Sequence, residues 1–265
     1  MTESEIWTDA ADPVRRIGRG VEFHAEIGST NDRAARALHE PDGEGLAVVA
    51  ELQTAGRGRR GRRWESPPGV NLMVSVGLRP LLAAHDAAWL GAAVALAVRD
   101  ACGVVGALAV KWPNDIVTGE GDKVAGLLLE TAIEGDRLAE AVIGIGVNVN
   151  WRRASMPLEI AARATSLADL AGHDVDRVAL LGRLLAALDR EVTAIEEGIS
   201  PIPRLRMASW LDGRVVSISL SDGSVTGSVA GMTDDGSLLL EGPHGVVAIG
   251  YGEVVRVEPR SGVTA

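Results

Sequence analysis

A short stretch rich in arginine and glycine limits what this chain can fold into more than any other feature. Five arginines and three glycines lie between Gly56 and Arg63. The preceding residues, Leu46 to Gln53, have the length and apolar content of a buried strand. Pro67 and Pro68 follow closely, and prolines at these positions prevent a long helix from beginning after the loop. The stretch is therefore predicted to be a loop delivered by a rigid strand.

This loop is strongly basic although the whole chain carries a formal net charge of -10. Positive charge is therefore concentrated in the loop. Glycine lets a backbone approach a ligand, and arginine binds phosphate through paired hydrogen bonds, so a phosphate-bearing ligand is one interpretation. A solvated basic loop is the other, because short charge runs often have no partner. Trp64 favours a ligand, since its ring could stack on a base, and a core anchor is its alternative role.

Several common enzyme motifs do not fit this sequence. Gly56 to Gly61 has the spacing of the dinucleotide-binding motif, but the helix that this motif requires does not follow. Neither a P-loop nor a serine-hydrolase or metalloprotease motif occurs. Cys102 has no disulfide partner and is expected to be inert core. We predict no metal site made by side chains, because the histidines lie in unrelated segments: His24, His39, His85, His173 and His244.

The rest of the chain predicts an α+β fold. Strands are expected at 21–27, 46–53, 70–78, 107–112, 123–130 and 141–149, and helices at 29–38, 83–102, 165–170 and 175–197. The segments 46–53 and 70–78 are expected to form an antiparallel hairpin with a long functional tip. Hairpin-like spacing favours a mixed or antiparallel sheet over a doubly wound parallel one.

We expect three parts along the chain. Residues 1–20 lack periodicity and are interpreted as a loosely held N-terminal arm that leaves no room for a DNA-binding helical domain. Residues 21–210 form the catalytic domain, which ends after a break at Ser200 to Pro203. Residues 211–265 contain short strands separated by Asp-Gly turns, which is typical of a small β-barrel.

Composition favours a cytoplasmic enzyme. The N-terminus has no secretion signal, and the longest apolar run, Ala87 to Val98, is too short to span a bilayer. A pI near 5.0 argues against a general nucleic-acid binder. We therefore expect neither a membrane nor a DNA partner.

Two further polar clusters interrupt the predicted strands. Lys111-Trp-Pro-Asn-Asp115 follows one strand, and Gly144-Ile-Gly-Val-Asn148 lies in another. Taken singly, Asp115 is more often a turn former and Asn148 a hydrogen-bonded structural residue. Together with Lys123, which begins a strand, they could converge near the arginine loop on one side of the sheet.

These segments carry a resemblance to a known family. Gln53 to Trp64, Lys111 to Asp115, Lys123 to Gly126 and Gly144 to Asn148 resemble, in this order, the motif set of biotin–protein ligases. The similarity spans about residues 21 to 260. It implies a catalytic domain related to class II aminoacyl-tRNA synthetases, a small C-terminal β-barrel, and the short form without an N-terminal DNA-binding domain.

The resemblance also implies a reaction. ATP, with Mg²⁺, would activate biotin to biotinyl-5'-AMP, and a specific lysine of a biotin carboxyl carrier protein domain of an acyl-CoA carboxylase would then accept the biotin. A lipoate–protein ligase-like acyl-adenylate transferase is the alternative, since it shares the implied fold and chemistry but should lack the dense arginine loop. In both cases positioning and electrostatic stabilisation supply the catalysis.

The site residues that the resemblance implies fall into three overlapping groups. Catalytic roles fall to Arg59, Lys123 and Asp115, with Asp115 near the incoming lysine. Biotin-binding residues are Ser29, Thr30, Asn31, Gln53, Gly56, Arg57, Gly58, Arg59 and Lys123. Residues that bind ATP or the adenylate are Arg57, Arg59, Arg62, Trp64, Asn114, Lys123 and Asn148. The loop is expected to be mobile without ligand and to order over the adenylate.

Overall fold

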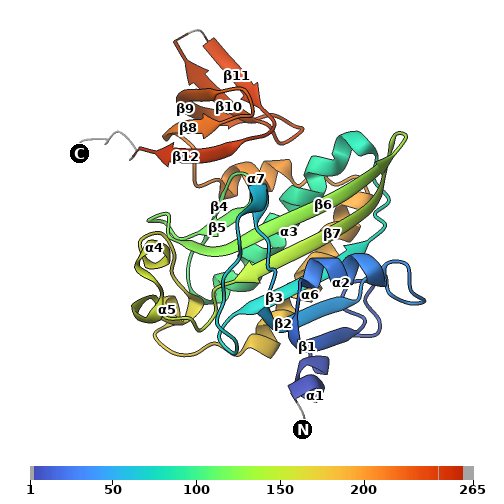
Figure 1. Ribbon diagram of the computed structural model, residues 1–265. Coiled ribbons are helices and arrows are strands. Elements are labelled where there is room, and N and C mark those ends of the chain that lie inside the picture. Colours follow the sequence, from blue (N-terminus) through green and yellow to red (C-terminus); the bar gives the residue numbers. More distant parts are fainter. Residues whose placement is uncertain (1–2, 244, 259–265) are drawn as a thin grey trace.

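A seven-stranded mixed sheet forms the larger part of the molecule (Figure 1). The structure is a computed structural model that describes residues 3–243 and 245–258. Across the sheet, the strands are β1 (Val21–Ile27), β2 (Ala47–Gln53), β3 (Leu72–Leu78), β7 (Arg137–Val147), β6 (Lys123–Glu134), β5 (Asp115–Val117) and β4 (Ala109–Lys111). Only β1 and β2 pair in parallel; all other neighbours are antiparallel. The predicted mixed sheet is confirmed.

The β2–β3 hairpin places the arginine loop at the end of two buried strands. Ala47 pairs with Val76 and Ala50 with Met73, so the register leaves residues 54–71 as a long connection. Inside it, only a 3-10 turn, Arg59–Gly61, is helical. The predicted hairpin with a long tip is therefore confirmed, and no helix of the dinucleotide-binding kind follows the glycines.

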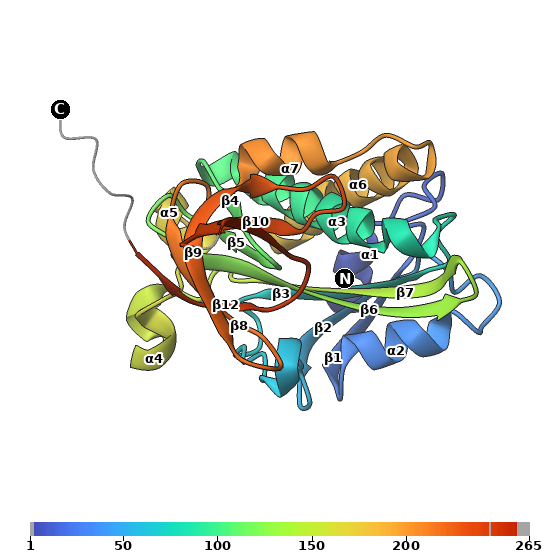
Figure 2. The ribbon, with the colours of Figure 1, turned by 90° about the horizontal axis from the view of Figure 1, so that it is seen from above.

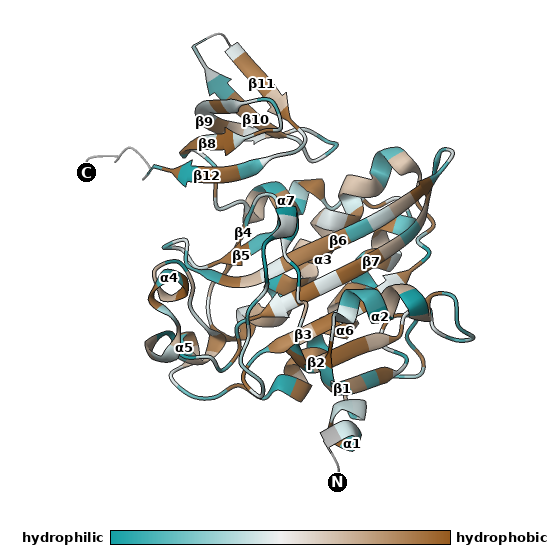
Figure 3. Cartoon of the chain, viewed as in Figure 1, coloured by the Kyte–Doolittle hydropathy of each residue, from teal (hydrophilic) through white to brown (hydrophobic). Residues whose placement is uncertain are grey.

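Helices cover both faces of this sheet, which explains why its strands are so apolar. In β2, Ala47 and Val49 belong to the main core, whereas Val48 packs with Ala34 and Leu38 on the opposite face. Figure 2 shows α3 (Ala87–Cys102) and α6 (Arg177–Glu196) on one side and α2 (Thr30–Ala37) on the other. Figure 3 shows β2 as largely hydrophobic for this reason.

The predicted core helix is α3. Together with its flanking 3-10 turns, the stretch Ala84–Val105 is long and apolar enough to cross a membrane by length and composition, unlike the shorter run considered from sequence. In the described part of the chain it is the one stretch that passes this test, and 56% of its window is buried. Contacts with α6, β4, β5 and β6 account for its apolar side chains.

The N-terminal arm is not loosely held, contrary to expectation. Its helix α1 (Glu3–Thr8) buries Trp7 to 4% exposure, and the Trp7 ring stacks on Phe23 with centroids 6.2 Å apart. The guanidinium of Arg177 lies 5.2 Å from the Trp7 ring centre. Further along, Ile17 is 1% exposed. The prediction of a loosely held arm was wrong, because single buried side chains such as Trp7 and Ile17 produce no periodic pattern in the sequence.

Beyond α6, the chain crosses to a second sheet. The predicted break at Ser200 to Pro203 is instead the start of α7 (Ile202–Ala208), because proline is tolerated in the first turn of a helix. Ser209 then bridges Val110, and Trp210 N donates to Val110 O at 2.8 Å, so the linker extends the β4 edge. Two short helices, α4 (Leu158–Ala161) and α5 (Leu167–Ala171), precede α6.

The C-terminal part is an all-β unit, as predicted, that lies above the β4 and β5 end of the first sheet (Figure 1). Its five antiparallel strands are ordered β11 (Gly245–Ile249), β10 (Leu238–Gly242), β9 (Ser224–Met232), β8 (Val215–Ser219) and β12 (Glu253–Val257). Over the described residues the pairings leave β11 and β12 as outer strands rather than joining them into a closed barrel. Residues 259–265 of the predicted domain lie outside the described residues.

Trp7→Ala tests whether the arm is part of the folded core. Removing this buried side chain should lower the free energy of unfolding by about 3 kcal/mol, because truncating a buried tryptophan leaves a large cavity. Chemical denaturation followed by circular dichroism measures the change. Val14→Ala is the matched control, since Val14 is 94% exposed. Equal unfolding midpoints for Trp7→Ala and the wild type would contradict the docking of the arm.

Candidate functional site

A cavity of about 760 Å³ opens on the face of the sheet that carries α2 and the arginine loop. The separate sequence clusters meet there, as expected. Of the residues named from sequence, these line the cavity: Ser29, Thr30, Asn31, Gln53, Arg57, Gly58, Arg59, Arg62, Trp64, Asn114, Asp115, Lys123 and Asn148. Gly56 does not line it. Gly56 lies at the base of the loop, where its carbonyl accepts a hydrogen bond from Trp64 N at 3.1 Å.

Uncharged polar groups fill one end of the cavity. The turn from β1 into α2 brings Thr30 against β2, and both Thr30 N and Thr30 Oγ1 donate to Gln53 Oε1, at 2.8 and 3.0 Å. Ser29 precedes α2 but makes no side-chain capping bond. Ser75, on β3, donates to Asn31 Oδ1 at 2.6 Å. Ser75 was not predicted from the sequence, although it is the one hydroxyl residue in the apolar segment 70–78.

Asn31 is held above the sheet from two sides. Its Nδ2 donates to Glu130 Oε2 at 2.6 Å, and its Oδ1 accepts from Ser75. Gly144 on β7 lies directly beneath, and a Cβ atom there would collide with Asn31 Oδ1. The missing side chain of Gly144 is therefore what allows the amide to lie this close to the strand.

The indole of Trp64 lies against two further glycines of the sheet, which we call the glycine floor. Gly126 of β6 and Gly146 of β7 are cross-strand partners, and a Cβ atom at either would press into the Trp64 ring. At Gly126 the same atom would lie 2.8 Å from Lys123 Nζ. Trp64 and Lys123 are therefore neighbours, with the ammonium 5.6 Å from the ring centre.

The other end of the cavity is cationic. Lys123 Nζ forms an ion pair with Asp115 Oδ1 at 2.6 Å. Arg59 is half-buried, with Nη1 3.5 Å from Asn114 Oδ1 and 3.4 Å from Gly252 O. Burial, with the neighbouring charge of Arg60, lowers the pKa of Arg59, which remains protonated because arginine is so basic. Asn114 is fixed by its own hydrogen bond to Leu127 O at 2.7 Å.

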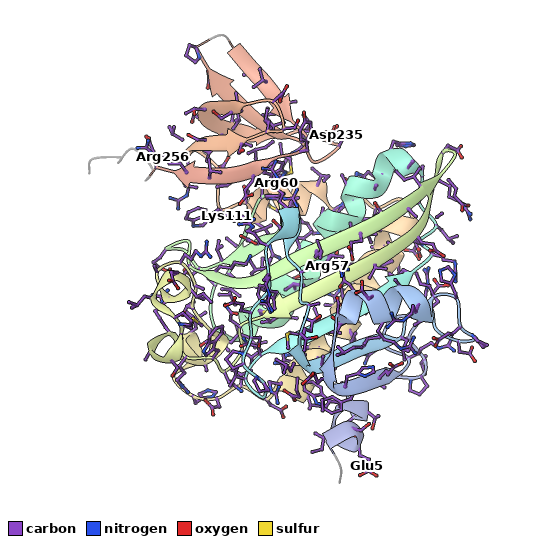
Figure 4. The ribbon with its side chains drawn as sticks, in the orientation of Figure 1. Glu5, Arg57, Arg60, Lys111, Asp235 and Arg256 are labelled. Atoms are coloured by element: carbon purple, nitrogen blue, oxygen red, sulfur yellow. The ribbon has the colours of Figure 1, made fainter. Side chains whose placement is uncertain are left out.

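The tip of the loop is held between two parts of the molecule (Figure 4). Figure 4 labels Arg57 and Arg60. Arg57 pairs with Asp32 of α2 at 2.7 Å. On the other side, Arg62 pairs with Glu253 of β12 at 2.7 Å, and Arg60 Nη2 donates to Ser219 O of β8 at 3.1 Å. Glu253 also lines the cavity, and nothing in its local sequence marked it.

Asn148 already has structural partners. Its Nδ2 donates to Lys123 O at 3.3 Å and Thr165 O at 3.1 Å, and the residue is 5% exposed. It therefore joins the start of β6 to the segment before α5 while lining the cavity.

Other reactive groups lie away from this chemistry. Burial raises the pKa of the Cys102 thiol to about 12, so this sulfur is a protonated core atom. Across residues 3–243 and 245–258, no group of three or more histidine, cysteine, aspartate or glutamate residues could hold a metal ion. His244 lies outside the described residues.

Known proteins share this sequence family and this architecture. Residues 25–148 match the biotin/lipoate A/B protein ligase family, and residues 213–257 match the biotin protein ligase C-terminal domain. A biotin–[acetyl-CoA-carboxylase] ligase from Mycobacterium tuberculosis is 34% identical over 248 residues, covering 90% of each chain. The chain belongs to the biotin protein ligase family. A second relative of the same description, from Paracoccus denitrificans, is 36% identical over 87% of this chain and 98% of its own.

The fold agrees with this family. A biotin protein ligase from Aquifex aeolicus, solved in complex with biotin and ATP, superimposes with a TM-score of 0.76 at 30% identity. The match covers 90% of this chain and 98% of that chain. The predicted class II synthetase-like catalytic fold with a C-terminal β domain is therefore confirmed, and the C-terminal match favours the biotin branch of the family over the lipoate branch.

Gly146→Ala tests the glycine floor. The added methyl group would collide with the Trp64 ring, so we expect the indole to move off the sheet and ligand binding in the cavity to weaken about tenfold or more. Isothermal titration with biotin measures the loss. Gly91→Ala is the control, because a Cβ atom there meets nothing within 4 Å. Equal affinity for both variants would contradict the proposed contact.

Proposed function

We propose that this protein is a biotin–protein ligase. It converts biotin and ATP into biotinyl-5'-AMP and pyrophosphate, then transfers biotin to a lysine of a biotin carboxyl carrier protein domain of an acyl-CoA carboxylase. The observation that carries the proposal is the order of groups along the cavity: uncharged hydrogen-bonding residues, then a glycine floor under an indole, then clustered cations. Biotin has the same order of parts, with a neutral ureido ring, an aliphatic chain and a carboxylate.

The ureido ring would occupy the uncharged end. Ser29, Thr30, Asn31 and Gln53 offer neutral donors and acceptors, which suit a group that carries no charge. Ser75 supports them by orienting Asn31. Along β7, Gly144 and Gly146 are two residues apart and face the same side, so the chain of biotin can follow this strand from Asn31 toward Trp64.

The carboxylate and the α-phosphate would meet at the cationic end. A carboxylate oxygen of biotin attacks the α-phosphorus of ATP, forming an acyl–phosphate bond. The bond from the α-phosphorus to the bridging oxygen breaks, and its electron pair leaves with pyrophosphate. Lys123 and Arg59 stabilise the negative charge that develops, with Arg57 and Arg62 as further contributors and Gly58 allowing close approach of the loop backbone.

The second step would use the same cavity. The neutral amine of the acceptor lysine attacks the acyl carbon, AMP leaves with the electron pair of the acyl–oxygen bond, and the amine loses a proton. Asp115 can orient the incoming amine, because its carboxylate lies at the cavity surface beside Lys123. We assign Asn114, Asn148 and the free edge of Trp64 to the adenylate side.

Mg²⁺ would enter bound to the phosphates of ATP. Magnesium sites of this kind use phosphate oxygens and water with one or two carboxylates. Asp115 and Glu253 are carboxylates of the cavity wall and fit that need. The bound ion would offset phosphate charge. We propose a cytoplasmic location, and neither DNA nor a membrane has a part in this function.

One experiment tests the function directly. The purified protein should incorporate labelled biotin into a biotin carboxyl carrier domain only when ATP is present. Lipoate in place of biotin should give little transfer, and a carrier domain with its target lysine changed to arginine should give none. Absence of biotin transfer, or equal transfer of lipoate, would overturn the assignment.

Arg59→Ala tests the cationic end. Losing a half-buried cation aimed at developing charge should reduce biotin-dependent ATP–pyrophosphate exchange by about 10²–10³-fold. Arg137→Ala is the matched control, because the Arg137 side chain is 63% exposed on the β6–β7 hairpin. An exchange rate equal to that of the control would remove Arg59 from the mechanism.

A further inference from the structure

Segments from distant parts of the chain meet at the base of the arginine loop. Arg177, the first residue of α6, donates to Glu51 near the end of β2 through Nη1 at 2.7 Å and Nη2 at 3.0 Å. Arg177 Nη1 also donates to Asn71 O at 3.1 Å. Glu51 lies before the loop and Asn71 after it, so one guanidinium group joins the two ends of the loop.

The end of the loop also holds the segment that follows β7. Asn71 Oδ1 accepts a hydrogen bond from Val149 N at 3.0 Å. Val70 O accepts another from Asn150 N at 2.7 Å. Asn148, which lines the cavity, comes directly before these two donors. A displacement of residues 70–71 would therefore move a second wall of the cavity as well as the loop.

The N-terminal arm covers the guanidinium group of Arg177. That group lies 5.2 Å from the centre of the Trp7 ring, which also stacks on Phe23 of β1. A guanidinium group that donates in its own plane leaves its faces free, and an aromatic ring attracts the cation from such a face. Trp7 is 4% exposed, and the side chains of Arg177 and Glu51 are 20% and 12% exposed. The arm limits the access of water to this ion pair, although none of its described residues lines the cavity.

We infer that Trp7 is a positioning residue of the active site and acts through Arg177. Its catalytic consequence rests on the proposed function. Excluding water lowers the effective dielectric constant around Arg177, which strengthens the attraction to Glu51. Arg177 then keeps the two ends of the arginine loop together. The cations of the loop, including Arg59, depend on these fixed ends for their distance from the reacting phosphate.

A residue that only adds to the core would behave differently from Trp7. It would change the free energy of unfolding and leave the contacts at the base of the loop unchanged in the native state. Ile17 offers the matched control, because it lies in the same arm and is 1% exposed. Its backbone N–H donates to Asp189, about three helical turns further along α6 than Arg177.

Amide hydrogen exchange at Gly69 tests the inference in the full-length protein without assuming any activity. Gly69 N donates to Glu51 Oε2 at 2.8 Å, so its protection reports the position of this carboxylate. Trp7→Leu keeps a large apolar side chain but should speed exchange at Gly69 about tenfold. Trp7→Phe should keep most of the protection, because it keeps a ring. Ile17→Ala should leave the exchange rate within about twofold of wild type.

The catalytic consequence is measured separately. Trp7→Leu should lower kcat/KM for biotin-dependent ATP–pyrophosphate exchange by about tenfold, and Ile17→Ala by no more than about twofold. Arg177→Lys keeps the charge but loses the paired hydrogen bonds to Glu51, so it should resemble Trp7→Leu. Since Trp7 acts through Arg177, combining Trp7→Leu with Arg177→Lys should add little to the loss that Arg177→Lys causes alone.

Three results would overturn the inference. Unchanged exchange at Gly69 in Trp7→Leu would show that the arm does not hold the base of the loop. Equal effects of Trp7→Leu and Ile17→Ala on Gly69 would assign Trp7 a general stabilising role. Fully additive losses in the double variant would show that Trp7 does not act through Arg177. Failure of the proposed function is distinguishable, because the wild-type protein would then lack biotin-dependent activity while Gly69 still responded to Trp7→Leu.

Discussion

Three glycines, one on β6 and two on β7, determine the shape of the site. Gly144 lies under Asn31 and Gly146 lies under Trp64, each too close to admit a methyl group without moving that side chain. Gly126 lies under both Trp64 and the end of Lys123. Because the strands alternate faces, these glycines form a flat strip on one side while their neighbours fill the core on the other. The strip lets the Asn31 amide and the Trp64 indole lie against the sheet. Larger residues would keep the apolar core intact and yet close the site.

The second constraint is the concentration of like charge. Arg57, Arg59, Arg60 and Arg62 lie on one short loop, and their mutual repulsion has to be offset within the molecule. Asp32 and Glu253 do this from opposite sides, one on α2 and one on β12. The C-terminal sheet is therefore part of the site's structure, because it supplies one carboxylate and two backbone carbonyls that contact arginines of the loop. A phosphate chain entering the cavity would compete with these groups for the same guanidinium groups.

Sequence patterns predicted what is local and missed what depends on distant contacts. The arginine loop, its two strands and the polar strand ends were recognisable because composition changes sharply at Gln53 and Pro67. Their convergence followed from shared sheet edges and from family resemblance. The cross-strand alignment of Gly146, Gly126, Asp115 and Lys111 on β7, β6, β5 and β4 was not predictable, because it requires the register of four strands. Glu253 was not predicted because the two domains meet only in the folded chain. Trp7 was not predicted because one buried side chain gives no periodic pattern in the sequence.

The base of the loop is fixed by a partly buried ion pair between Glu51 and Arg177. Glu51 precedes the loop on β2, and its carboxylate accepts from Gly69 N, after the loop, at 2.8 Å. Arg177 binds the same carboxylate at 2.7 Å and donates to Asn71 O at 3.1 Å. Because the pair is partly withdrawn from water, further hydrogen bonds are needed to offset its desolvation, and Gly69 N and Asn71 O provide them. Residues at both ends of the loop are therefore tied to α6, while the tip is held mainly by exposed arginines.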